Sequence, residues 1–265
     1  MRRESDPLAH WPDRVPLYGD GDRLLVVYTG TESARTGRRW ADGVWRPAST
    51  PIAAARDAAL DVFAGWLVST ADLALANELI AAGATQLRHA HVMSHDLVAA
   101  HPVATDSRLR IEPLGPAQVD RHAHRLGELS FAAYPPGHPD HQQDTEQSAR
   151  SQMHAIARGE VLGPMMAESR VALAKGQIIG ACLVVDRPGK PSQGGPWIVE
   201  LFRDPSSSAK GVGRSLLSAV LTAARDRALP GLSLAVSHDN ARANQLYLGL
   251  GFTGVAESWT LDLPS

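Results

Sequence analysis

Two stretches of this chain, residues 23–97 and 197–263, show the same predicted order of secondary structure, β-α-β-α-β. The prediction rests on polar and apolar residues that alternate in the strands, apolar residues at helical spacing, and glycine or proline at the breaks. Residues 74–79 and 241–246 also align in sequence, and both helices end at a glycine. An internal repeat constrains the fold strongly, because the two copies must share one strand order.

Chance similarity between two alanine-rich helices is the alternative explanation of this alignment. Different strand orders in the two stretches would exclude a repeat. The region between them predicts further elements: a strand at 108–112, helices at 116–133 and 145–158, and the two strands of a hairpin within 171–186. We therefore predict a smaller α/β domain at 1–100, a linker at 101–107 and a second domain at 108–265.

The composition is that of an ordinary soluble protein, with 44% hydrophobic and 20% charged residues. The formal net charge is -2, so no basic excess favours binding to nucleic acid. No apolar run approaches the ~20 residues that span a bilayer, and the first residues lack the apolar segment of a secretion signal. The single cysteine, Cys182, cannot form an internal disulfide, which favours a reducing compartment. We expect a cytoplasmic protein, monomeric or homodimeric, with no nucleic-acid or membrane partner.

A strand-to-helix turn in the second half has the features of a phosphate-binding site. The strand at 197–202 leads through a short loop to Gly211 and Gly213 in the first turn of a helix. The first amides of a helix lack partners inside the helix and attract anions, and glycine lets a phosphate approach them closely. The sequence of this turn does not match the Walker A motif. Leu216 stands where a dinucleotide-binding fingerprint has its third glycine. Taken alone, the two glycines are explained equally well by a phosphate site and by close packing at the start of the helix.

A second group of residues follows at the next strand-to-helix turn, and together the two groups resemble the GCN5-related N-acetyltransferase (GNAT) family. That family has a Gln/Arg-x-x-Gly-x-Gly/Ala loop after its fourth strand, and then Asn-x-x-Ala-x-x-Leu-Tyr ahead of Gly-Phe. The matching residues are Gly211, Gly213, Asn240, Ala243, Leu246, Tyr247, Gly251 and Phe252. Ser208 stands where the family has Gln or Arg, which removes a side-chain contribution but leaves the backbone amides.

This resemblance, which covers the chain from residue 108 to its end, implies a fold and a cofactor. The implied fold is α/β (α+β), with a mixed, mostly antiparallel central sheet flanked by helices and with splayed fourth and fifth strands. The implied cofactor is acetyl-CoA or a related acyl-CoA, with its pyrophosphate on the glycine loop and its pantetheine arm along the fourth strand. The implied cofactor-binding residues are Leu201, Phe202, Arg203, Ser208, Ala209, Lys210, Gly211, Val212, Gly213, Arg214, Asn240 and Ala243.

The resemblance also implies an activity, the transfer of an acetyl group to a primary amine of a small molecule or peptide. Glu200 shares a strand face with Phe202 and is the candidate general base, and Tyr247 is the candidate general acid toward the leaving thiolate. The candidate substrate contacts are Tyr134, His138 and His238. The alternative roles are an ion-paired strand carboxylate at position 200 and a packed ring at position 247. The alternative function is a non-catalytic CoA-binding or sensor protein with a decayed site.

The first half lacks the features of a cofactor site. Residues 43–53 contain no Gly-x-Gly, and Ile80 replaces the tyrosine, so we expect no cofactor there. His89, His91 and His95 alternate along a predicted strand, so some of them share a face. Since no carboxylate or cysteine lies at a matching spacing, we expect no metal ion.

Overall fold

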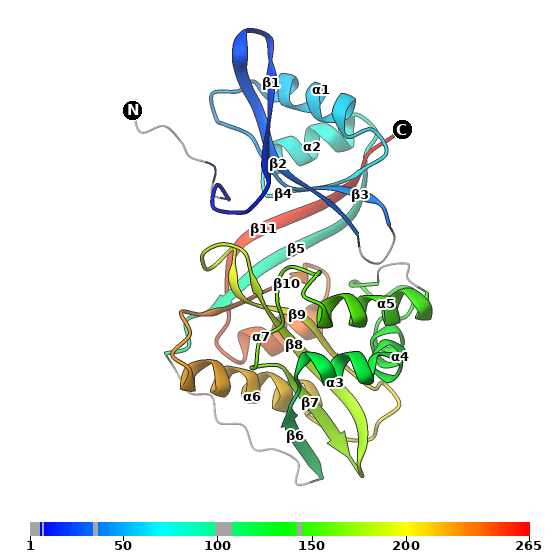
Figure 1. Cartoon of the computed structure of the whole chain (residues 1–265). Helices are drawn as coiled ribbons and strands as arrows, with labels where there is room; N and C mark the ends of the chain where they lie inside the picture. Colours follow the sequence, from blue (N-terminus) through cyan, green and yellow to red (C-terminus); the bar gives the residue numbers. More distant parts are fainter. Residues whose placement is uncertain (1–5, 7, 34–36, 99–107, 142–144) are drawn as a thin grey trace. The chain divides into compact units, whose positions relative to one another are not determined.

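The protein forms two compact units (Figure 1), in a computed structural model that describes residues 6, 8–33, 37–98, 108–141 and 145–265. The first unit contains the described residues up to Ser33, together with Gly37–His91 and Ala256–Ser265. The second contains the described residues of Val92–Val255. The predicted linker at 101–107 lies outside the described residues. The compact units differ from two contiguous halves, because residues 256–265 join the first unit.

The first unit builds its sheet from strands at both ends of the sequence. Its elements are β1 (Arg14–Gly19), β2 (Arg23–Glu32), β3 (Arg39–Trp45), α1 (Ile52–Val62), β4 (Leu67–Thr70), α2 (Leu73–Ala81), β5 (Thr85–His95) and β11 (Thr253–Asp262). The strand order is β1-β2-β3-β4-β11-β5. The pair β3–β4 is parallel, whereas β1–β2, β2–β3 and β4–β11 are antiparallel.

In its described residues, the second unit has helices both before and after its hairpin strands. Its elements are β6 (Leu109–Pro113), α3 (Pro116–Arg121), α4 (Ala123–Ala133), α5 (Glu146–Ala157), β7 (Arg170–Ala174), β8 (Gln177–Arg187), β9 (Gly195–Arg203), α6 (Val212–Asp226), β10 (Leu232–Ser237) and α7 (Ala241–Leu248), with the ends of β5 and β11. The strand order is β6-β7-β8-β9-β10-β5-β11. The pair β9–β10 is parallel, and β6–β7, β7–β8 and β8–β9 are antiparallel.

The two strand orders agree when they are compared strand by strand. Strands β1, β2, β3, β4 and β5 of the first unit correspond to β7, β8, β9, β10 and β11 of the second. In the first unit, β11 lies between β4 and β5, and in the second unit β5 lies between β10 and β11. Each unit therefore contains one strand from the other half of the sequence. The equal orders confirm the predicted repeat. They also account for the unit boundaries at His91 and Val255, which fall inside β5 and β11.

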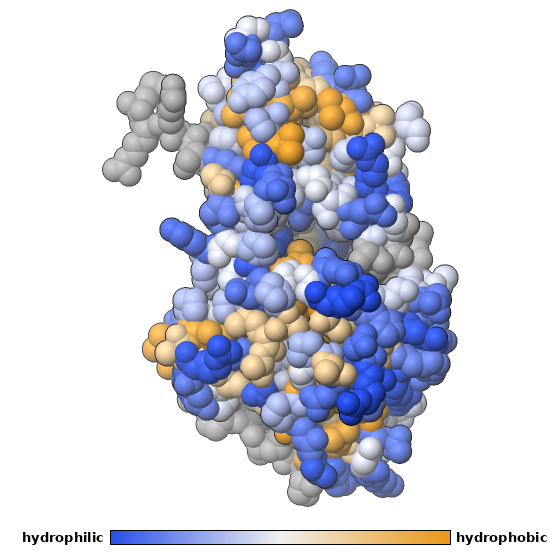
Figure 2. Space-filling view, in the orientation of Figure 1, coloured by the Kyte–Doolittle hydropathy of each residue, from blue (hydrophilic) through white to orange (hydrophobic). Residues whose placement is uncertain are grey.

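Each unit has its own hydrophobic core. In the second unit, β8 is buried along both faces from Ile179 to Val185, and both α4 and α6 pack against it. Cys182 lies fully buried in this strand, and burial raises the pKa of its thiol, so it is a core residue. On the face drawn in Figure 2, hydrophilic residues predominate and apolar ones form small groups. Among the described residues, every helix is too short or too polar to cross a membrane.

Candidate active site

Strands β9 and β10 pair at their beginnings and then part. The paired residues are Trp197 with Ser233 and Ile198 with Leu234. On its other edge, β9 has a β-bulge at Val199, where its register with β8 shifts. A bulge bends its strand and increases the local twist, so it directs the rest of β9 away from β10. This is the splay of the fourth and fifth strands that the resemblance implied.

The loop at residues 134–141 is hydrogen-bonded to both parted strands. At one end, the Tyr134 hydroxyl donates to the Leu201 carbonyl oxygen of β9 at 2.8 Å. At the other, the Asp140 carboxylate accepts from the Ser237 amide of β10 at 3.2 Å and from Asn240 Nδ2 at 2.7 Å. The loop therefore spans the gap between β9 and the start of α7. Asp140 makes the bonds at the second of these ends, and no sequence pattern identified this residue.

The histidines of this loop stabilise its conformation. The His138 ring meets the Tyr134 ring edge-on, with centroids 5.1 Å apart, and its Nδ1 accepts from the Asp140 amide at 3.1 Å. The Nδ1 of His141 lies 2.7 Å from the Tyr134 carbonyl oxygen. Of the three candidate substrate contacts, Tyr134 and His138 therefore lie together. His238 follows β10, is half exposed, and pairs with Asp239 at 2.9 Å.

The glycine loop opens α6 with an exposed backbone. Gly211 caps the helix with φ of 69° and ψ of 11°, and a Cβ atom there would meet nothing within 4 Å. A Cβ at Gly213 would meet Leu246 at 3.6 Å. The Ala209 amide donates to the Ser207 hydroxyl at 3.3 Å, which shapes the approach to the helix. A ligand can therefore come close to the first amides of α6, whose orientation suits an anion.

The remaining residues of this loop differ in exposure. Ser208 and Lys210 are exposed, whereas Val212 is buried in the core. The Arg214 guanidinium lies 3.5 Å from the Gly249 carbonyl oxygen and so connects α6 to the end of α7. Ser208 and Lys210 can face a ligand, whereas Val212 and Arg214 fix the position of the helix.

The start of α7 is capped by Asn240, whose side chain makes two contacts. Its Oδ1 accepts from the Ala243 amide at 3.0 Å, while its Nδ2 donates to Asp140. One helical turn further on, Tyr247 is 8% exposed and meets the Phe252 ring edge-on. Glu200 on β9 is 5% exposed. Both candidate catalytic side chains are therefore shielded from solvent. Away from water, a charged or polar group has a stronger electrostatic effect.

Gly180 allows β8 and β9 to approach closely beside the implied cofactor residues. A Cβ atom at this position would lie 2.7 Å from the Phe202 carbonyl oxygen and 3.3 Å from Val212 Cγ1. Phe202 is 3% exposed and Arg203 half-buried, so β9 has little freedom to move away. Gly180 therefore determines where this end of β9 lies relative to the glycine loop.

We expect Gly180→Ala to lower the free energy of unfolding by about 1–3 kcal/mol, because the added methyl group overpacks a strand pair. Thermal unfolding measures the effect. The control is Gly30→Ala in β2, where a Cβ atom would meet only Tyr28 Cε2 at 3.7 Å. Equal melting temperatures for the two variants would contradict the predicted overpacking.

The corresponding strands of the first unit stay paired. The β3–β4 register continues to Val44 and Thr70, and the Thr70 hydroxyl donates to the Val44 carbonyl oxygen at 2.8 Å. Beyond β3, Arg46 pairs with Asp72 at the start of α2 and donates to the Thr50 carbonyl oxygen at 2.8 Å. In this unit β3 and β4 stay paired, and the Arg46 side chain is bonded within the loop that follows β3. These two features give a physical reason for the prediction that this unit holds no cofactor.

Comparisons with known proteins agree with this geometry. The model of the Acetyltransferase (GNAT) family matches residues 123–252. No curated protein sequence matches the chain. A solved GCN5-related N-acetyltransferase from Sphaerobacter thermophilus is 16% identical with a TM-score of 0.63, over 94% of this chain and 79% of that chain.

Two further solved structures share the fold along almost the whole chain. A tandem GNAT protein from the clavulanic acid biosynthesis pathway is 15% identical with a TM-score of 0.57, over 96% of this chain and 85% of that chain. A GCN5-related N-acetyltransferase from Kribbella flavida is 13% identical with a TM-score of 0.56, over 98% of this chain and 92% of that chain. Residues 123–252 include the loop at 134–141, the parted strands and the glycine loop. This chain therefore carries an acetyltransferase domain of the GNAT family at residues 123–252, within a fold shared with a tandem GNAT protein.

Proposed function

We propose that this chain transfers an acetyl group from acetyl-CoA to a primary amine of a small molecule or peptide, by direct attack in a ternary complex. The observation that carries the proposal is the parting of β9 from β10 next to a helix start that opens at Gly211. A parted strand can pair with an extended ligand arm, and a helix start can hold a diphosphate. Acetyl-CoA has both parts.

The residues around the parted strands fit this cofactor. The amides of residues 209–214 would hold the pyrophosphate, and the backbone of residues 201–203 would pair with the pantetheine arm. Asn240 would contact the arm from the side of α7, in exchange for or beside its bond to Asp140. When bound, acetyl-CoA supplies the acyl group and a thiol leaving group.

The chemistry assigned to the chain's own residues is proton transfer and polarisation. A lysine-like amine has a pKa of about 10.4, so removing its proton at pH 7 costs about 4–5 kcal/mol. We assign this proton to the Glu200 carboxylate, directly or through one water. A strand amide near Phe202 would polarise the acyl carbonyl group. The Tyr247 hydroxyl would return a proton to the leaving sulfur, a smaller task because a thiol has a pKa of about 8.5.

The acceptor would bind beside the loop at residues 134–141. Tyr134 and His138 lie together on this loop, and Asp140 attaches it to Asn240. These contacts support a role for the loop in binding an acceptor next to the acyl group. We include His238 as a third contact because it is half exposed and directly follows β10, at the end of the strand to which Asp140 is bonded.

The experiment that tests the function is release of free CoA from acetyl-CoA in the presence of a panel of primary amines and amino-terminal peptides. We expect release that depends on the amine, and calorimetry should show one acetyl-CoA bound per chain. Binding without release by any amine would favour the non-catalytic alternative. No measurable affinity for acetyl-CoA would exclude both functions, and two cofactors per chain would contradict the assignment of the first unit.

We expect Tyr247→Phe to lower kcat by about tenfold or more, because the variant keeps the ring but loses the proton donor. Steady-state kinetics measure this change, and thermal unfolding should be nearly unaltered. The matched control is Tyr28→Phe in the first unit, whose ring meets Phe63 edge-on as Tyr247 meets Phe252. Unchanged turnover in Tyr247→Phe would leave this residue a packing role only.

A further inference from the structure

The edge of β9 that parts from β10 carries the backbone groups that an extended ligand would use. On the other edge, the Asp204 amide donates to the Ile179 carbonyl oxygen of β8 at 2.8 Å. Hydrogen-bonded pairs alternate along an antiparallel ladder, so the backbone groups of Phe202 face β8, whereas those of Leu201 and Arg203 face the parted edge. The Leu201 carbonyl oxygen therefore lies where the proposed coenzyme arm would pair with β9.

Two side chains of the loop at residues 134–141 already hold groups at this place. The Tyr134 hydroxyl donates to the Leu201 carbonyl oxygen at 2.8 Å. The Asp140 carboxylate accepts from Asn240 Nδ2 at 2.7 Å, and from both the amide and the hydroxyl of Ser237. The pantetheine arm of acetyl-CoA contains amide groups, whose N–H and C=O are a donor and an acceptor of the same kinds. The loop and the arm therefore suit the same partners.

On the basis of the function proposed above, we propose that the loop at residues 134–141 occupies part of the coenzyme site, and that acetyl-CoA binds by displacing it. An N–H group of the arm takes the place of the Tyr134 hydroxyl at Leu201, and a C=O group takes the place of the Asp140 carboxylate at Asn240. Paired strands lie about 4.8 Å apart. An arm paired with β9 needs the space in which the Tyr134 hydroxyl now lies, 2.8 Å from the Leu201 oxygen.

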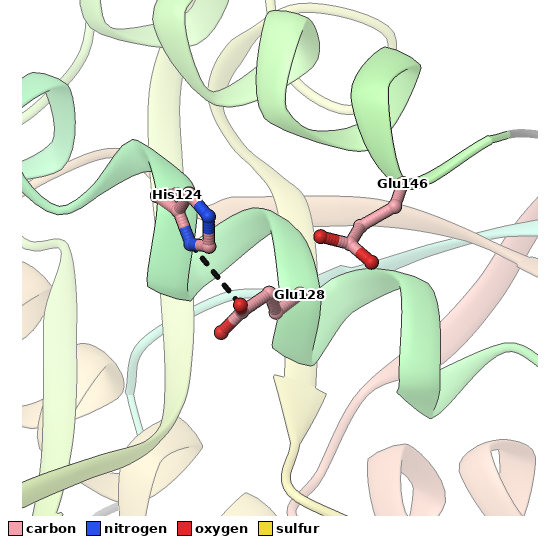
Figure 3. Close-up of side chains that lie close together, drawn as sticks. All are labelled: His124, Glu128 and Glu146. Atoms are coloured by element: carbon pink, nitrogen blue, oxygen red, sulfur yellow. Dashed lines mark ion pairs between the residues drawn. The ribbon is translucent and has the colours of Figure 1, made fainter.

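The helices on either side of the loop are fixed to each other, so the exchange involves only the segment between them. A Cβ atom at Gly127 of α4 would lie 2.8 Å from Arg150 Cα of α5, which shows how closely the two helices pack. Figure 3 shows this helix pair, with His124 and Glu128 paired on α4 and Glu146 reaching toward them from the start of α5. Displacement of the loop therefore breaks its bonds to β9, β10 and α7 and leaves the packing of α4 on α5 intact.

The test is calorimetric titration of the full chain and of Tyr134→Phe with acetyl-CoA. Phenylalanine keeps the ring but cannot hold the Leu201 carbonyl group, so the affinity should rise by about two- to tenfold, the range that one neutral hydrogen bond gives. Asp140→Ala should raise the affinity by about tenfold or more, because its hydrogen bonds involve a charged group. The controls Tyr28→Phe in β2 and Asp120→Ala in α3 remove the same groups outside the loop and should bind as the unchanged protein does.

Hydrogen–deuterium exchange gives a second readout on the unchanged protein. When acetyl-CoA saturates the chain, residues 134–141 should exchange faster, while residues 209–214 of the glycine loop should exchange more slowly. A ligand that only covers a preformed site would slow exchange in both segments. The opposite signs therefore distinguish displacement of the loop from simple protection.

The outcomes separate this inference from the proposed function. If Tyr134→Phe binds acetyl-CoA no more tightly than the unchanged protein, or if exchange of residues 134–141 slows, the inference is overturned and the proposed function stands. No affinity in the unchanged protein or in any variant overturns both, whereas affinity that appears only in the two loop variants supports both. If Asp140→Ala does not fold, as judged by circular dichroism, Tyr134→Phe and the exchange measurement decide the question.

Discussion

Replacing Gly211 with valine should weaken acetyl-CoA binding by roughly hundredfold. A Cβ atom at Gly211 would point into space that is open for 4 Å, and in the proposed complex this space holds the diphosphate. A branched side chain there would keep the charged oxygens from the first amides of α6. Each hydrogen bond to a charged group contributes about 1.5–3 kcal/mol, and each ~1.4 kcal/mol corresponds to about tenfold in affinity. Loss of one or two such bonds gives the expected change, which calorimetric titration with acetyl-CoA measures.

The control for this variant is Gly176→Val in the turn between β7 and β8. Gly176 has φ of 76°, close to the 69° of Gly211, and a Cβ atom there also meets nothing within 4 Å. Both variants therefore carry the same backbone strain, of about 1–2 kcal/mol, but only one alters the proposed cofactor site. Equal affinities of the two variants for acetyl-CoA would contradict the location of the diphosphate.

The glycine loop and the cap of α7 could be predicted because their signals are local, whereas the parting of β9 from β10 was implied only by the family resemblance. Gly211 stands at the one position before α6 where the backbone takes a positive φ, and such a position favours glycine in any sequence. Asn240 caps α7 through the amide three residues later, which is the usual spacing of a capping side chain. Short stretches of sequence therefore encode the site's backbone without reference to the rest of the fold.

Contacts between distant segments gave no comparable signal. Asp140 reaches Ser237 and Asn240 across 97 and 100 residues, and nothing in its own neighbourhood marks it. The predicted helix at 116–133 is in fact two helices, because His122 has φ of -100° and ψ of 14° and ends α3. Strand β1 was not predicted, since it contains a proline and no buried residue on either face.

The exchange of closing strands is a further feature that a single sequence cannot show. Strands β5 and β11 are equivalent strands of the two repeats. Each could lie next to the preceding strand of its own half, β5 next to β4 and β11 next to β10, instead of the observed neighbours β4–β11 and β5–β10. The sequence pattern alone does not decide between these arrangements, because period-2 alternation specifies a face and not a partner. The side-by-side placement of β5 and β11 creates the contact of Glu257 with His89 and His91.

Replacing Glu200 with glutamine should lower kcat/KM by roughly hundredfold for an amine of high pKa, since the variant keeps the shape of the side chain but cannot accept a proton. The acid limb of the pH–rate profile should move to the pKa of the amine itself, because protonation of the general base no longer sets it. Affinity for acetyl-CoA should be unchanged. Steady-state rates over a range of pH, with calorimetry for the cofactor, measure these three quantities.

The acceptor itself supplies the sharpest control for this prediction. An amine with a pKa below the assay pH arrives already neutral, so its rate should fall far less in Glu200→Gln than the rate of a lysine-like amine. A general loss of packing would lower both rates alike. The matched variant is Glu112→Gln on β6, a half-buried strand carboxylate of the same unit that is paired with Arg110. If this variant lowers the rates as much as Glu200→Gln, or if the acid limb of Glu200→Gln stays where it lies in the unchanged protein, Glu200 is a structural strand residue and the base must be sought among the groups of the loop at 134–141.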